Sequence, residues 1–178
     1  MSLQQLIHAI EDSALADWMR YTPRAMPVVE AVHVLAAITV FGTLLFVDLR
    51  LLGLVDARRP FTRVSRQILP ITWGAFGISV FTGALMFATS AQVYFGNPAF
   101  RFKMLALLGA GLNMACFQLM TMRGVAAWDE GKPPRAARLA SAVSILLWAS
   151  VVLLGRWIGF TKGYDFTIPA GYSFDFGG

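Results

Sequence analysis

The chain has 178 residues, of which 57% are hydrophobic and only 14% are charged, whereas an ordinary soluble domain carries roughly a quarter charged residues. This composition excludes a typical soluble enzyme, and we expect a single membrane domain over residues 1–178. The net charge of +5 comes from basic residues in short segments beside apolar runs. Such residues ordinarily set membrane orientation, so nucleic acid is excluded as a partner.

The N-terminal segment, residues 3–20, places its apolar side chains at steps of three and four. Polar residues such as Gln4 and Asp17 fall elsewhere around the same helix. This pattern predicts an amphipathic helix that lies in the membrane interface. Pro23 and Pro27 then end the helix and turn the chain into the bilayer.

Four apolar runs follow, and each is long enough to cross about 30 Å of hydrocarbon at about 1.5 Å per residue. The expected spans are residues 27–54, 68–89, 99–122 and 139–160. The predicted fold is therefore an all-α integral membrane protein, a four-transmembrane-helix bundle whose surroundings are the lipid bilayer.

Basic residues gather in the segment that joins the first two runs and in the segment that joins the last two. By the positive-inside rule both segments are cytoplasmic. We therefore expect both termini on the extracytoplasmic side of a bacterial inner membrane. Both segments also contain the pattern Asp-x-x-(Arg or Lys)-Pro, at Asp56–Pro60 and Asp129–Pro133, which we interpret as a weak repeat.

The C-terminal tail, residues 161–178, combines aromatic residues with Gly and Pro and has no helical period. It also carries too few charges for a freely solvated tail. We expect the tail either to cover the protein's own extracytoplasmic end or to dock a homo-oligomer or a larger membrane complex, because aromatic residues are enriched at interface cores.

Ionisable residues inside an apolar span are costly, so each needs a partner or a function. Those at the outer ends of the spans are Glu30, His33, Lys103 and Arg156. The first and third spans begin outside and the fourth ends outside, so the topology places these four side chains at similar depth. They form the predicted site.

A histidine inside a membrane bundle is a common ligand of haem iron or of a metal ion. Lys103 and Arg156 would pair with haem propionates, or Lys103 would be a second axial ligand. One alternative is that His33 and Glu30 only hydrogen-bond between helices. Another is that they handle a metal ion or a proton. Copper is a further alternative, because Met19, Met26, Met86 and Met104 map to the same side and thioethers suit Cu(I).

Other polar residues near the membrane are assigned no function. His8 lies on the N-terminal helix and is expected to face solvent or headgroups. Asp48 and Arg50 lie near the inner end of the first span and are expected to reach the interface by snorkelling.

The run from Glu30 to Gly42 (Glu-Ala-Val-His-Val-Leu-Ala-Ala-Ile-Thr-Val-Phe-Gly) resembles the opening helix of HemJ-type protoporphyrinogen oxidases and of the CopD copper-resistance membrane domain. The run Arg101–Leu108 resembles the HemJ helix that opens with Lys followed by Leu and Ala. The resemblance implies that His33 contacts haem and that Lys103 is the matching lysine. The whole chain is similar to an uncharacterised bacterial family of four-helix membrane proteins.

The function expected from these residues is that of a small cytochrome b-like membrane subunit, which binds haem b in an outer-leaflet pocket and takes part in electron transfer. One alternative is a CopD-like protein that binds or transfers copper through His33 and the outer methionines. The other is a non-catalytic subunit of a larger membrane complex. Whether the chain is an enzyme stays open at this stage.

Overall fold

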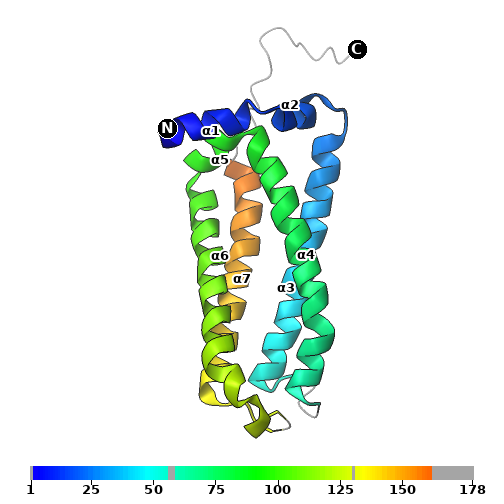
Figure 1. The fold of residues 1–178 in the computed structure, drawn as a ribbon, viewed down its shortest axis with the longest axis vertical. Helices are drawn as coiled ribbons and strands as arrows, with labels where there is room; N and C mark the ends of the chain where they lie inside the picture. Colours follow the sequence, from blue (N-terminus) through cyan, green and yellow to red (C-terminus); the bar gives the residue numbers. More distant parts are fainter. Residues whose placement is uncertain (1, 56–58, 130, 162–178) are drawn as a thin grey trace, which may run out of the picture.

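The computed structural model describes residues 2–55, 59–129 and 131–161, and every element in these ranges is a helix. In chain order the elements are α1 (Leu3–Glu11), α2 (Ala14–Tyr21), α3 (Ala25–Leu52), α4 (Phe61–Thr89), α5 (Ala91–Gly96), α6 (Pro98–Cys116), the π-helical turn η1 (Phe117–Thr121), the 3-10 helix η2 (Met122–Ala127) and α7 (Arg135–Thr161). The long helices stand side by side, and α1, α2 and α5 lie across one end of them (Figure 1). We call this end the capped end and the opposite end the loop end.

Four helices are long and apolar enough to cross a membrane: α3, α4, α6 continued through η2, and α7. The 28 residues of α3 extend about 42 Å at about 1.5 Å per residue, which exceeds the hydrocarbon thickness of about 30 Å. The prediction of a multi-pass, all-helical membrane protein is confirmed. The side of the membrane on which the capped end lies stays a prediction.

The spanning helices form two antiparallel hairpins. The first hairpin pairs α3 with α4, the second pairs α6 with α7, and α3 packs against α7 to join the two. Hydroxyl side chains support the first hairpin, because Thr72 Oγ1 donates a hydrogen bond to Thr43 Oγ1 over 2.8 Å. Such interhelical bonds between small polar residues are a common means of joining helices in membranes.

The N-terminal segment forms two helices where the sequence pattern predicts one. The break falls at Asp12 and Ser13, because the Ser13 side chain accepts a hydrogen bond from the Ala16 N–H and so caps α2. Met19 of α2 is buried, with 1% of its surface exposed, and α2 packs on α3 and α4. Trp18 remains exposed. The interfacial position of α1 and α2 stays a prediction.

The first helical turn of α4 is capped by a residue that is distant in sequence. The Asp129 carboxylate accepts hydrogen bonds from the Thr62 N–H (2.8 Å) and the Thr62 hydroxyl (2.6 Å), and the Asp129 carbonyl accepts one from the Phe61 N–H (3.1 Å). The helix therefore begins seven residues before the expected position 68. These bonds tie the segment after η2 to the start of α4.

The expectation that Asp48 and Arg50 snorkel to the interface is wrong. Their exposed fractions are 7% and 1%. The Arg50 guanidinium donates to the backbone carbonyl of Arg59 and interacts with the charge of Asp129. Apart from Thr161, the expected tail lies outside the described residues, so its proposed docking stays a prediction.

Candidate functional site

His33 lies on α3 near the capped end and faces α4. Its Nδ1 is 2.9 Å from the backbone carbonyl oxygen of Ser79 and 3.1 Å from the hydroxyl oxygen of Thr82. The Thr82 hydroxyl donates its own hydrogen to the Ile78 carbonyl over 2.7 Å, so its oxygen can only accept from the ring. A carbonyl oxygen also only accepts. Nδ1 therefore carries the hydrogen, and the neutral ring keeps a lone pair on Nε2.

Each of His33 and Lys103 is bordered by a glycine of the neighbouring helix. A Cβ atom placed on Gly83 of α4 would lie 3.1 Å from Cε1 of His33. A Cβ atom placed on Gly155 of α7 would lie 3.4 Å from Nζ of Lys103. Each hairpin therefore carries one nitrogen base on its first helix, close against a glycine on its second.

The charges of Lys103 and Glu30 both act on the His33 imidazole, so the structure places these three groups in one neighbourhood. Glu30 also acts on Tyr94 of α5, which packs against the rings of Phe87 and Phe100. Burial, with the Glu30 charge as a smaller cause, raises the pKa of the Tyr94 phenol to about 12. Tyr94 therefore keeps its proton at neutral pH, and it joins the site as a neutral group.

Arg156 follows Gly155 on α7, but its side chain is exposed and lies over the ring of Phe160, with 5.0 Å between the guanidinium carbon and the ring centroid. In the described part of the chain, no hydrogen bond or ion pair joins it to the other three predicted site residues. His8 is exposed, and its Nδ1 lies 3.0 Å from Nε2 of Gln92, so it links α1 to α5.

Sequence reasoning missed most of the groups that hold the imidazole. Ser79 and Gly83 are four residues apart and share one face of α4. Small residues on one face indicate close helix packing, but they do not indicate that this face binds the His33 ring. Nothing in the sequence indicated that Thr82 would contact His33. Tyr94 belongs to a short helix outside the spans, and nothing in its local sequence marks the electrostatic effect that Glu30 has on it.

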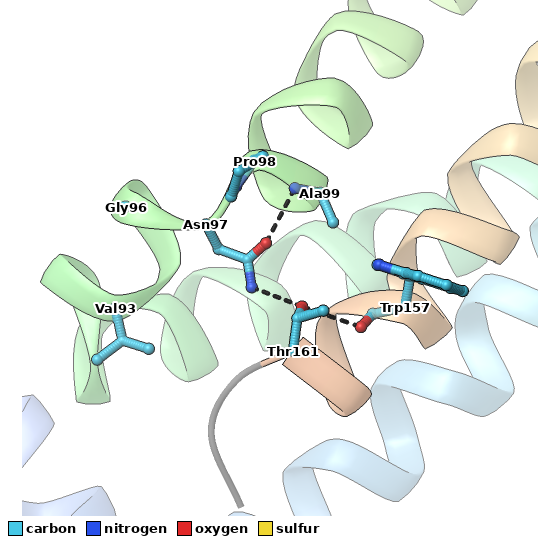
Figure 2. Close-up of a pocket in the computed structure, with 7 residues that line it drawn as sticks. All are labelled: Val93, Gly96, Asn97, Pro98, Ala99, Trp157 and Thr161. Carbon is cyan, nitrogen blue, oxygen red and sulfur yellow. Dashed lines mark hydrogen bonds between the residues drawn. The ribbon is translucent and has the colours of Figure 1, made fainter.

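The two best-defined pockets of the described chain lie at the capped end, and His33 lines neither of them. The larger has a volume of about 380 Å³ and lies between the start of α6 and the end of α7 (Figure 2). Asn97 joins these two helix ends, because it donates to the Thr161 hydroxyl over 2.9 Å and accepts from the Ala99 N–H over 2.9 Å (Figure 2).

Within residues 2–55, 59–129 and 131–161, no group of three or more His, Cys, Asp and Glu side chains could hold a metal ion together. A metal ion bound here would need ligands of another kind besides His33. The arrangement offers one neutral imidazole with a fixed tautomer.

The sequence profile of a family of unknown function (DUF6644) matches residues 21–161. This range includes all four spanning helices and the whole His33 neighbourhood. No curated protein and no solved structure matches the chain. The match agrees with the expected uncharacterised family, whereas the resemblance to HemJ-type oxidases and to CopD stays a prediction.

Proposed function

Because the chain belongs to a family of unknown function, we propose its role from the site itself: it is a small cytochrome b-like membrane subunit that binds haem b through His33 and takes part in electron transfer. One observation carries this proposal. The Nδ1–H of His33 is committed to the Ser79 carbonyl, which leaves Nε2 as a free ligand.

Histidines that bind a metal almost always donate their other ring N–H to a carbonyl, a carboxylate or water. That bond fixes the tautomer and the orientation of the ring, and it makes the ligating nitrogen more basic. In His33 the acceptor of this hydrogen bond is the backbone carbonyl of Ser79. A substitution of the Ser79 side chain would thus leave the acceptor in place. His33 would therefore hold haem through Nε2, and the haem iron would supply one-electron chemistry there.

The charges around His33 also suit haem. Lys103 is near enough to the imidazole for its charge to act on it, so its ammonium group can pair with a propionate. Arg156 is not assigned this role, because its guanidinium lies over the ring of Phe160. His33 lines neither of the two pockets described above, so haem held by His33 would occupy neither of them.

The absorption spectrum tests the proposal. Protein made with haem in supply and purified in detergent should show a Soret band that His33→Ala removes. His8→Ala is the matched control, because the chain has two histidines and His8 is exposed and bonded to Gln92. A colourless wild-type protein, or a Soret band that survives in His33→Ala, contradicts the proposal. Copper bound in place of haem would favour the CopD-like alternative.

Lys103→Met separates the two roles open to the lysine. If Lys103 pairs with a propionate, the variant should bind haem more weakly with the same spin state of the iron. If Lys103 is the second axial ligand, the variant should change the spin state. Lys132→Met is the control, since Lys132 is an exposed lysine near the loop end.

The orientation that we propose places the capped end outside a bacterial inner membrane. Its support is the row of exposed arginines near the starts of α4 and α7, at the loop end: Arg63, Arg66, Arg135 and Arg138. Cysteine labelling at residue 135 should report the cytoplasm and labelling at residue 20 the opposite side. The reverse pattern would overturn this orientation and leave the haem test unaffected.

A further inference from the structure

Asp48 is a carboxyl group inside the bundle at the opposite end of α3 from His33. The two residues are 15 positions apart, or about 22 Å at about 1.5 Å per residue. Only 7% of Asp48 is exposed, and its Oδ2 atom is buried without a hydrogen-bond partner among the described residues. The side chains of Ser144 and Ser141 on α7 lie against the carboxyl group.

Apolar residues separate Asp48 from the loop end. Leu51, 3% exposed, is one turn further along α3, and Ala137, fully buried, is one turn before Ser141 on α7. Both belong to a buried apolar cluster with Val47 and Phe61. The seam between the two hairpins is therefore apolar and buried on the loop-end side of Asp48.

The basic side chains of the helices around Asp48 either have other partners or are exposed. Arg50, two residues further along α3, is bonded to the Arg59 carbonyl and acts on Asp129. The arginines on the two helices that pack against α3 are exposed: Arg63 and Arg66 on α4, and Arg135 and Arg138 on α7. An ionised Asp48 would thus be a buried charge whose contacts are two neutral hydroxyl groups, at a cost of several kcal/mol.

We propose that Asp48 is a proton-binding site in the membrane-spanning part of the protein, which holds the carboxyl group as the neutral acid at neutral pH. Ser141 and Ser144 hydrogen-bond the carboxyl, and binding a proton removes the cost of a buried charge at the α3–α7 seam. A proton fits better than a metal ion, because one carboxyl and two hydroxyl groups supply fewer oxygens than a hard cation takes. The proposal does not depend on His33 or on haem.

Dicyclohexylcarbodiimide tests this site, because it forms a stable acylurea with protonated carboxyl groups in apolar surroundings. Full-length protein in lipid vesicles at neutral pH should be labelled at Asp48, as located by peptide mass spectrometry. Asp48→Asn should lose the label at that peptide. Asp17, an exposed carboxylate that pairs with Arg20, is the internal control and should stay unlabelled.

Infrared spectroscopy is a second, independent test of whether the Asp48 carboxyl group is protonated. Wild-type protein should show the carbonyl band of a protonated carboxylic acid, and the isosteric Asp48→Asn variant should lack it while keeping the helical circular dichroism signal. A protein with no such band and no label at Asp48 overturns the proposal. Label that sodium ions suppress at constant pH also overturns it, because the site would then bind a metal ion.

Discussion

Removing the Asp129 carboxylate should destabilise the protein measurably, although this residue lies outside the spans. Asp129 caps α4 from 67 positions away, through bonds of 2.8 Å and 2.6 Å to Thr62. Pro60, the residue in the capping position of α4, has no side-chain bond to offer. The first turn of α4 therefore depends on Asp129 for its side-chain cap.

The size of the effect follows from the kind of bonds that are lost. Replacing a capping side chain by Ala costs about 0.5–2 kcal/mol, and a hydrogen bond to a charged group contributes about 1.5–3 kcal/mol when it is shielded from water. Asp129 is only partly buried, so solvent screens its charge. We expect Asp129→Ala to lower the free energy of unfolding by about 1–2 kcal/mol.

Titration with SDS in mixed micelles, followed by circular dichroism, measures this change. Asp17→Ala is the matched control: it removes an exposed carboxylate that pairs with Arg20 over 3.6 Å, and its effect should stay within about 0.5 kcal/mol. An Asp129→Ala variant as stable as this control would refute the capping argument.

The hydrogen bonds between Thr62 and Asp129 also predict that the stability of the protein depends on pH. Hydrogen bonds from Thr62 hold the pKa of Asp129 below its ordinary value. A folded pKa below the unfolded one gives stability that is present above the unfolded pKa and lost as the pH falls through the folded pKa. The stability difference between the wild type and Asp129→Asn should therefore be largest near neutral pH and vanish in strong acid. A difference that grows on acidification contradicts this sign.

Two further substitutions test the packing around the site. Gly83→Ala should be less stable than Gly77→Ala, because a Cβ atom on Gly83 would lie 3.1 Å from Cε1 of His33, whereas one on Gly77 would meet no atom within 4 Å. Equal melting temperatures for the two variants would contradict the contact. Thr72→Val removes the 2.8 Å bond to Thr43 and should cost about 0.6 kcal/mol in the same SDS titration, so an unchanged unfolding curve would show that the bond contributes nothing.

The spans could be predicted from the sequence because length and apolar composition alone decide whether a helix can cross a bilayer. The start of α4 could not. The apolar run begins near Ile68, but the helix begins at Phe61 because Asp129 caps it from another part of the chain. Ser13 did carry a local signal for the break between α1 and α2, and the continuing apolar period concealed it.

The candidate site could also be predicted only in part. His33 stands out because an ionisable residue inside a span is rare. Its tautomer depends on a backbone carbonyl of another helix, which no side-chain pattern reveals. The exposure of Arg156 and the burial of Asp48 depend on how each helix is rotated about its axis. Tertiary packing sets that rotation, and a sequence without a strong amphipathic period does not.

The central claim is that His33 offers Nε2 to haem iron. Nitrogen-15 NMR of cofactor-free protein, labelled at its two histidines, measures this directly during a titration with haem. We predict that free His33 shows the Nδ1-protonated tautomer, and that its signals shift or broaden in proportion to bound haem while those of His8 keep their positions. A His33 ring protonated at Nε2, or His33 signals that stay unchanged after haem has bound, would contradict the account.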